Sequence, residues 1–325
     1  MTVSSVKTGY DGISLLVGNA AYIPIGDRGL FANGTTNSGT MLNDIEYVSI
    51  ATTGNSIFFG DLSVTRGDTG ACASSTRGIF AGGYTMPSYV DSNVIDYVTF
   101  TTTGNATDFG DLSLARQAVT SSFNDSTRGV FSGGYQGSSY VNTIDYITMA
   151  STGNASDFGD LTVARGYAAG ASSTTRGLTM SGFGGSANNT LDYVTIATTG
   201  NATDFGDAVT ARYYTHGASN NTRAVYGSGQ AASGFQQNME YVTIATTGNA
   251  TTFGGYGLNA SAYHVSACSN STRIVFAGGL NGTAGGSFID MRYITIATTG
   301  DATDFGDLTQ ALGALSGCSN SNGGL

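Results

Sequence analysis

The two histidines are the first candidates for chemistry in this chain. His216 and His264 stand in neighbouring copies of a repeated sequence and lie equally far from its Thr-Gly glycine, although they differ by two residues when counted back from the next arginine. A catalytic zinc ion usually has three protein ligands, so two imidazoles are a weak metal motif. The sequence leaves two interpretations open: a two-histidine metal or ligand site in a central channel, or two polar residues that face solvent there.

A recurring Asp-Phe-Gly-Asp element offers carboxylates and backbone carbonyls in one turn, which are ligands that Ca²⁺ accepts. Phe58, Thr252 and Gly255 break the carboxylate pattern in some copies, and no EF-hand spacing is present. We therefore predict no cofactor and no metal, with Ca²⁺ as the minor alternative.

No catalytic motif accompanies these residues. No Gly-x-Ser-x-Gly element stands at a strand-to-helix turn. Two acids brought together by the fold could still form a glycosidase pair. Most acids, however, occupy repeated positions, and the exception Asp91 lies in a variable loop without an obvious partner. We predict that the protein is not an enzyme.

The arginines follow the repeat closely. Six share one position and four share another, and the sets are Arg28, Arg77, Arg128, Arg176, Arg223 and Arg273, then Arg66, Arg116, Arg165 and Arg212. Arg292 stands where other copies carry Glu46, Asp96, Asp145, Asp192 and Glu240.

An aspartate precedes each arginine of the second set by five residues, at Asp61, Asp111, Asp160 and Asp207. Copy five has Gly255 and Ala260 instead, whereas copy six keeps Asp307 beside Leu312. Because an unpaired buried charge is costly, joint loss in copy five predicts a partly buried pair between these aspartates and arginines.

The repeat itself predicts the architecture that positions these residues. Its Thr-Gly glycine falls at Gly54, Gly104, Gly153, Gly200, Gly248 and Gly300, at intervals of 50, 49, 47, 48 and 52 residues. A period of roughly 40–50 residues with four strand-like segments is typical of a β-propeller. Residues present in every copy are expected to belong to the scaffold, and residues that differ between copies are expected to contact a ligand.

In the copy that begins at Arg77, strands are expected over 78–83, 94–101, 108–115 and 118–123. The first copy lacks its preceding strand, and the stretch from Ala314 to Ser321 aligns with that missing piece. We predict an all-β, six-bladed propeller over residues 28–325, with four antiparallel strands per blade and closure by the C-terminal strand. Residues 1–27 lie outside the repeat and are expected to attach the propeller to something else.

The composition of the chain excludes some classes of binding partner. The chain has 49 glycines among 325 residues, one lysine (Lys7) and a net charge of −10. Nucleic acid is a disfavoured partner because phosphate binding needs a basic surface. No run of about 18 apolar residues exists, so membrane insertion is not expected. The cysteines Cys72, Cys268 and Cys318 share one repeat position, where other copies carry Phe or Ala, and are expected to be buried.

The loops in which the copies disagree are the predicted ligand site. The candidate residues are Tyr84, Tyr89, Asp91, Tyr135, Tyr140, Phe183, Asn188, Phe235, Gln237, Asn281 and Phe288. Aromatic residues beside Ser, Gly, Asn and Gln are typical of binding loops. Aromatic faces with amide hydrogen-bonding groups would suit sugars. The alternative is that these rings only pack the loops.

The repeat resembles the kelch motif over residues 28–325. The matching residues are Gly82 and Gly83 at a strand end, then Tyr97, Phe109, Leu112 and Arg116. Kelch repeats normally carry Trp where this chain has Phe109. The resemblance implies a propeller fold and little about function.

A second resemblance concerns biology. Arrays such as Asp192-Tyr-Val-Thr-Ile-Ala-Thr-Thr-Gly-Asn-Ala-Thr-Asp-Phe-Gly-Asp207 look like those of predicted virion proteins of marine tailed bacteriophages, and residues 6–19 are similar to the start of other phage structural proteins. This implies a non-catalytic virion protein, at a tail fibre or as a capsid decoration, which is extracellular when assembled. Residues 1–27 would dock onto other virion proteins, and the propeller would bind a host-surface glycan or protein. Homo-oligomer formation stays open. The alternatives are a free lectin-like propeller and a polysaccharide-degrading enzyme.

Overall fold

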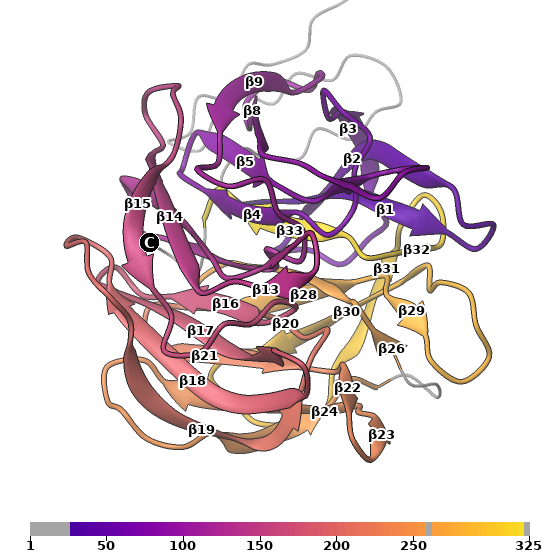
Figure 1. Cartoon of the computed structure of the whole chain (residues 1–325). Helices are drawn as coiled ribbons and strands as arrows, with labels where there is room; N and C mark the ends of the chain where they lie inside the picture. The colour runs from indigo at the N-terminus through magenta and orange to yellow at the C-terminus, as the bar shows by residue number, and fades with distance from the viewer. Residues whose placement is uncertain (1–26, 258–261, 322–325) are drawn as a thin grey trace, which may run out of the picture.

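Six sheets, each of at least four antiparallel strands, are arranged around a central axis in the computed structural model, which describes residues 27–257 and 262–321 (Figure 1). The sheets are the blades of a propeller, and each is built from β-branched and aromatic segments joined by Gly-, Ser- and Thr-rich turns. The chain is therefore a six-bladed β-propeller, as the repeat predicts.

Each blade extends from an innermost strand beside the axis to an outermost strand, and its strands pair in that order. Blade 1 contains β33 (Ser316–Ser319), β1 (Arg28–Thr36), β2 (Met41–Ser49) and β3 (Ile57–Asp61). Blade 2 contains β4 (Gly70–Ala73), β5 (Arg77–Ala81), β8 (Val94–Thr99) and β9 (Thr107–Asp111). Blade 3 contains β10 (Ser121–Asn124), β11 (Arg128–Ser132), β14 (Thr143–Thr148) and β15 (Ser156–Asp160).

The other three blades repeat this order. Blade 4 contains β16 (Ala169–Ser172), β17 (Arg176–Phe183), β18 (Ala187–Thr195) and β19 (Thr203–Arg212). Blade 5 contains β20 (His216–Ser219), β21 (Arg223–Gly227), β24 (Asn238–Thr243) and β25 (Thr251–Gly255). Blade 6 contains β27 (Ser266–Ser269), β28 (Arg273–Ala277), β30 (Asp290–Thr295) and β31 (Thr303–Asp307).

Short strands decorate one end of the blades. They are β6 (Tyr84–Thr85) with β7 (Val90–Asp91), β12 (Tyr135–Gln136) with β13 (Ser139–Tyr140), β22 (Gln230–Ala231) with β23 (Gly234–Phe235), and β26 (Ala262–Tyr263) with β29 (Leu280–Asn281). The strand β32 (Leu312–Gly313) pairs with the end of β1.

The ring closes as the sequence predicts. The last strand β33 pairs antiparallel with β1, with Gly29 opposite Ser319 and Ala32 opposite Ser316. The first blade therefore combines strands from both ends of the repeat array, and this pairing joins the two ends of the ring.

All four strands expected in the copy that begins at Arg77 are shorter than the sequence pattern suggests: β5 ends at Ala81 instead of residue 83, and β8 ends at Thr99 instead of residue 101. The other two differ most. In blade 2 the outer strand β9 ends at Asp111 instead of residue 115, and the innermost strand of blade 3 begins at Ser121 instead of residue 118. The reason is the connection between them: Leu112 and Arg116 turn into the interior, and Ala118 has a positive φ of 57° that a strand residue does not adopt.

The repeated Thr-Gly-Asn turn joins each blade to the one before it. The Gly104 amide donates to the Phe59 carbonyl at 2.8 Å, and the Asn105 side chain accepts from the Asp61 amide at 3.1 Å. A Cβ on Gly60 would collide with the Gly104 carbonyl. The glycines of the repeat are therefore required by close backbone approach between blades.

The first arginine set also links neighbouring blades. Each guanidinium lies 4.4–4.8 Å from the centroid of a tyrosine ring in its own blade, as Arg77 does over Tyr97. The Arg77 guanidinium also donates to the Met149 carbonyl of the next blade at 3.0 Å. These arginines are scaffold, held by cation–π contact and a backbone acceptor.

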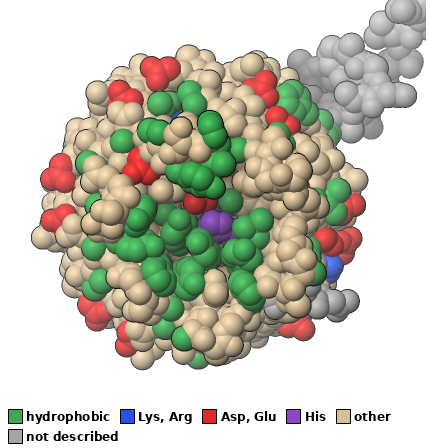
Figure 2. Space-filling view, turned by 45° about the vertical axis from the view of Figure 1, so that its right-hand side comes forward, with side chains coloured by type: hydrophobic (Ala, Val, Ile, Leu, Met, Phe, Trp, Pro, Cys, Tyr) green, Lys and Arg blue, Asp and Glu red, His purple; other side chains and the backbone are tan. Residues whose placement is uncertain are grey.

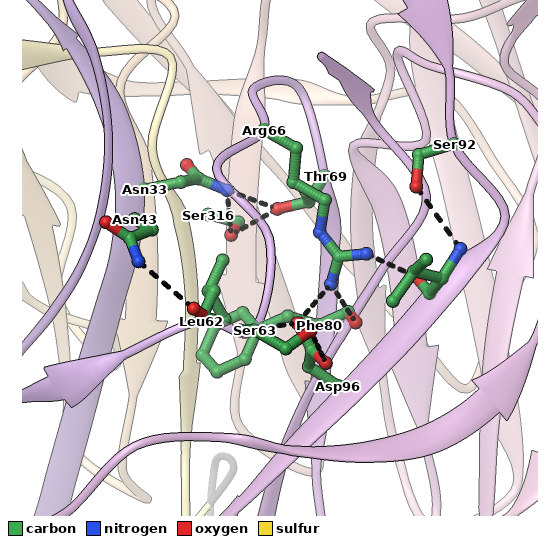
Figure 3. Close-up of polar contacts among 11 residues, drawn as sticks. Asn33, Asn43, Leu62, Ser63, Arg66, Thr69, Phe80, Ser92, Asp96 and Ser316 are labelled. Carbon is green, nitrogen blue, oxygen red and sulfur yellow. Dashed lines mark hydrogen bonds and ion pairs between the residues drawn. The ribbon is translucent and has the colours of Figure 1, made fainter.

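The second arginine set is buried and ion-paired, but not with the aspartates that the sequence predicts. Arg66 pairs with Asp96 at 2.9 Å, with both side chains fully buried (Figure 3). The other pairs are Arg116–Asp145, Arg165–Asp192 and Arg212–Glu240. The predicted partner Asp61 instead lies half-buried at the blade edge, as do Asp111 and Asp160, while Asp207 is exposed. The prediction was wrong because the arginine side chain extends into the next blade. There it meets an acid from the following copy, as Arg66 meets Asp96, which is 30 residues further along the chain.

Copies that lack the pair show how the acid is otherwise used. Blade 1 has Leu312 in place of the arginine, and its Glu46 accepts hydrogen bonds from Ser56 and Thr309. In blade 6 the acid position holds Arg292, whose guanidinium lies 3.6 Å from Asp290. The arginine that would reach this blade is replaced by Ala260 of copy five, so blade 6 lacks both members of the observed pair.

Apart from the buried ion pairs, hydrophobic side chains fill the space between the faces of neighbouring blades. Cys72, Cys268 and Cys318 are buried in these cores, as predicted, and are free thiols. Within residues 27–257 and 262–321 no helix has the length and apolar character needed to cross a membrane.

Candidate functional site

Six connections carry the chain from the outer strand of one blade to the innermost strand of the next, and all six share an unusual backbone conformation. One residue in each has φ between 54° and 59°, namely Asp68, Ala118, Tyr167, Tyr214, His264 and Ala314. We call these residues the mouth ring. None is glycine, although a positive φ is unfavourable for other residues. Strain of this kind at non-glycine residues concentrates at functional sites.

Backbone hydrogen bonds hold the mouth ring together. The Tyr167 amide donates to Ala118, the His264 amide donates to Tyr214, and the Ala314 amide donates to His264, each at 3.2 Å. Equivalent residues of neighbouring blades are therefore in direct contact around the axis. Their side chains converge on the end of the central channel.

A hollow of about 560 Å³ opens at this point, on the face that carries the variable loops. Five of the six mouth-ring residues line it, and Ala118 is the exception. Tyr84, Tyr89, Tyr263, Gln117 and Gln230 contribute to its walls. Figure 2 shows hydrophobic side chains, tyrosine included, gathered around a histidine in this hollow. We call it the mouth hollow.

Aromatic rings continue from the mouth hollow across the neighbouring loops. Tyr140 contacts Tyr135 and Phe183, with ring centroids 5.0 and 5.5 Å apart. Phe183 contacts Tyr213 at 4.7 Å, and Tyr213 contacts Tyr214 of the mouth ring at 4.8 Å. These rings are half-buried, so each presents an edge or a face to solvent. The result is a continuous aromatic surface over blades 3 to 5.

Asp68 and His264 lie at the floor of the mouth hollow. The His264 Nε2 atom is 3.8 Å from an Asp68 carboxylate oxygen, and the side chains are 8% and 7% exposed. Burial raises the pKa of Asp68 to about 7, and a hydrogen bond from Tyr167 opposes this rise. Burial, followed by the nearby His216, lowers the pKa of His264 well below its usual value. At neutral pH the floor therefore combines a neutral imidazole with a carboxyl group near its midpoint.

His216 lies beneath the floor, further along the channel. Its ring centroid is 6.3 Å from that of His264, and burial lowers its pKa to about 4. Neither of its ring nitrogens has a hydrogen-bond partner. The narrow space around it, about 30 Å³, is lined by small polar residues that include Thr69, Thr120 and Ser316.

The polar side chains next to this space are hydrogen-bonded to one another. Asn33 donates to Thr69 at 2.6 Å and to Ser316 at 3.4 Å, and the two hydroxyl groups are 2.7 Å apart (Figure 3). These contacts join blades 1 and 2 below the mouth ring.

The two histidines are not structurally equivalent. His264 belongs to the mouth ring and corresponds to Tyr214, whereas His216 begins the innermost strand β20. The count back from the next arginine is therefore the correct one. The described part of the chain contains no group of three or more His, Cys, Asp or Glu side chains placed to hold a metal ion.

The predicted loop residues separate into three groups. Tyr84 and Tyr89 stack at 5.4 Å and line the mouth hollow. Tyr135, Tyr140 and Phe183 form the aromatic surface, and Phe235 stacks on Tyr263 at 4.9 Å. The third group has local roles and consists of Asp91, Asn188, Gln237, Asn281 and Phe288.

The members of the third group stabilise the loops. Asp91 has the partner that the sequence did not reveal, because it accepts from the Gly137 amide of the next blade at 2.7 Å. The Asn188 side chain accepts from the Thr190 amide within β18, and the Asn281 side chain accepts from amides of its own loop. The Gln237 backbone carbonyl accepts from the Tyr256 amide, and Phe288 packs against the hydrophobic cluster between blades 5 and 6.

The sequence pointed to His264, but not to the other five mouth-ring residues or to their neighbours Tyr213 and Tyr263. A signal was present: the residue two positions after the second arginine is Asp68, Ala118, Tyr167 or Tyr214, so it differs between copies. The sequence pattern masks this signal, because it predicts that residue 118 belongs to the innermost strand and not to a connection with its own backbone conformation.

Comparison with known proteins adds no relative to this description. No protein-family model matches the chain, and no curated protein matches its sequence. The class of protein is thus set by the fold alone, as a six-bladed β-propeller with an aromatic hollow at one end of its channel.

Proposed function

We propose that the chain is a non-catalytic, glycan-binding propeller whose ligand occupies the mouth hollow. The observation that carries this proposal is the composition of the hollow, which combines five tyrosines, two glutamines and a partly open shape on the face where the repeats differ. Tyrosine offers a large apolar ring and a hydroxyl group at little entropic cost. Amide side chains supply donors and acceptors for sugar hydroxyl groups.

The same lining favours binding over hydrolysis. Glycosidases typically use two carboxylates, about 5–9.5 Å apart, on either side of the scissile bond. Asp68 is the single carboxylate among the described residues that line the mouth hollow. A polysaccharide-degrading enzyme is therefore the weaker alternative.

The biological setting that we propose is a virion of a tailed bacteriophage, with the propeller as an exposed head at a tail fibre or on the capsid. Its support is the resemblance of the repeat to kelch-type arrays and to predicted phage virion proteins, together with the opening segment 6–19. In this proposal residues 1–27 dock onto other virion proteins, and almost all of this segment lies outside the described residues. A free lectin-like propeller with the same ligand site is the alternative.

Glycan binding is tested with a glycan array and a matched pair of variants. Tyr89→Ala removes an aromatic ring that is 64% exposed at the mouth hollow, and Phe58→Ala removes one that is 53% exposed on the outer strand β3. We expect wild type and Phe58→Ala to bind the same glycans and Tyr89→Ala to bind them at least about fivefold more weakly. Equal binding by all three proteins would place the ligand elsewhere, and release of shortened glycans would favour the enzyme.

The virion setting needs a separate test. We expect the chain in purified virions, and we expect deletion of residues 1–27 to abolish association with particles while the circular dichroism spectrum of the propeller is retained. Absence from virions with intact glycan binding would favour the free lectin-like protein.

A further inference from the structure

The floor of the mouth hollow presents two hydrogen-bond acceptors to one point. An Asp68 carboxylate oxygen and His264 Nε2 are 3.8 Å apart, which is too far for a direct hydrogen bond. His264 Nε2 has no partner in the described structure, although His264 is only 6% exposed. A buried polar atom without a partner is costly and calls for an explanation. A ligand group seated above both atoms would supply it.

The chemistry of the two atoms selects the ligand group. An ionised carboxylate only accepts hydrogen bonds, and a neutral imidazole protonated on Nδ1 accepts at Nε2. A hydroxyl group has one hydrogen and can serve one acceptor at a time. An ammonium group has three hydrogens and can donate to both atoms at once, with a charge-assisted bond to Asp68.

The walls of the mouth hollow fit a cation as well. No lysine or arginine is among the described residues that line it. Tyr167 and Tyr214 are in contact at 4.4 Å between ring centroids, and Tyr84 stacks on Tyr89 at the rim. Tyrosine faces attract ammonium groups through the ring quadrupole, most strongly where water is excluded. The net charge of −10 adds a general attraction for cationic ligands.

We propose that the mouth hollow binds a protonated amine carried on a glycan, as in an amino sugar with a free amino group, with Asp68 and His264 as its hydrogen-bond acceptors. This inference rests on the glycan-binding function proposed above and names the class of sugar. The tyrosine rings then enclose the remaining faces of the ammonium group.

Protonation of Asp68 sets the pH dependence. The titratable groups that face Asp68 are Tyr84, Tyr167, Tyr214 and His264, with His216 behind His264. The tyrosine pKa values are raised by burial, so these rings stay neutral. Ionised Asp68 binds the cation, and its pKa is about 7 in the free protein. Affinity therefore rises with pH up to about 7 and falls again where the amine loses its proton.

The experiment compares three probes by isothermal titration calorimetry with the full-length chain at pH 7. Glucosamine oligomers carry free amines, N-acetylglucosamine oligomers of the same length are neutral, and choline carries a fixed charge without N–H groups. The test variant is Asp68→Asn, which keeps the shape of the side chain. The control is Asp108→Asn, which removes the same charge at an exposed position on β9. Thermal melts check that both variants are folded.

We expect wild type and Asp108→Asn to bind the glucosamine oligomer at least about tenfold more tightly than the acetylated oligomer, with choline between them. Asp68→Asn should lose this preference. A wild-type preference for the acetylated oligomer, or an Asp68→Asn variant that still prefers the free amine, overturns the inference while glycan binding stands. Binding of choline without either oligomer would support the cation site and contradict the glycan function. Binding of none of the probes overturns the inference.

Discussion

The two ends of this propeller use the same kinds of residue for different purposes. At the end that carries the Thr-Gly-Asn turns, each Tyr is covered by an arginine, as Tyr97 is by Arg77 at 4.7 Å, and packs edge-on against a phenylalanine, as Tyr97 does against Phe109 at 5.9 Å. At the mouth end Tyr89 is 64% exposed. Repetition therefore marks the side chains that hold blades together, and variation marks those left available to a ligand.

Hydrogen bonding shows the same contrast. Buried Arg116 donates to the carboxylate of Asp145 at 2.7 Å and to the carbonyl of Gly133 at 2.8 Å, so its charge is well compensated. At the mouth, nitrogen atoms of His216 and His264 are buried without partners. The charge of the repeated Arg116 is compensated inside the protein although its connection lies on the mouth face, whereas the variable mouth-ring residue His264 keeps a nitrogen that only a ligand or solvent can satisfy.

The largest effect is expected from the scaffold. Arg116→Met leaves the Asp145 carboxylate buried without its partner, so the free energy of unfolding should fall by about 3–5 kcal/mol, as measured by urea denaturation at pH 7. Asp111→Asn, which changes the partner that the sequence suggests, should alter stability by no more than about 0.5 kcal/mol. Similar losses in both variants would contradict the observed pairing.

The mouth should dominate the pH dependence of stability. His216 has a folded pKa of about 4 against an ordinary value of 6.5, so between these values the unfolded state binds more protons and stability rises with pH. The contribution is roughly 3 kcal/mol and is complete above about pH 6.5. His216→Asn should flatten this rise in urea denaturation curves recorded between pH 4 and 8.

Asp68 should change the stability with pH in the opposite direction. Its pKa is raised from 3.8 to about 7, so the folded state binds more protons in that interval and stability falls as pH rises. Asp68→Asn should therefore steepen the net rise that His216 and His264 produce. An unchanged pH profile in both variants would show that these groups are not buried as described.

Replacing glycine by alanine compares the stability cost of the same substitution at a repeated position and in a variable loop. Gly110, in the repeated Asp-Phe-Gly-Asp element, has a positive φ and a Cβ direction that meets the Gly153 carbonyl, so Gly110→Ala should cost about 2 kcal/mol or more. Gly137, in a variable loop, also has a positive φ but has open space around it, and Gly137→Ala should cost about 1 kcal/mol. Urea denaturation measures both losses in the free energy of unfolding, and a larger loss for Gly137→Ala than for Gly110→Ala would contradict this prediction.

The smallest stability effect should come from the exposed rings. Tyr89→Ala loses one stacking contact with Tyr84 and should lower the free energy of unfolding by about 0.5 kcal/mol, close to the value for Phe58→Ala. A loss above about 2 kcal/mol for Tyr89→Ala would assign that ring to the scaffold, which would remove the contrast between the two ends.

The order of strands could be predicted because it depends on local features repeated along the chain. Six copies of one pattern indicate six blades, and the C-terminal stretch that completes the first copy indicates closure through β33. The aromatic loops around Tyr84 and Tyr140 were also found, since variation between copies is visible in the sequence. Asp68, Tyr167 and Tyr214 were not, because their left-handed backbone cannot be read from residue type when none is glycine.

By itself, therefore, the sequence determined the number of blades, their closure and the end of the molecule that varies. The tertiary structure decided the pairing of charges and the composition of the mouth. Arg66 lies close to Asp61 in sequence, yet its guanidinium reaches Asp96 in the interior of the next blade, where both side chains are 0% exposed. The physical reason is that blade packing brings together residues from separate copies. The favourable partner of a buried charge or ring is set by that packing and by the loss of water around it.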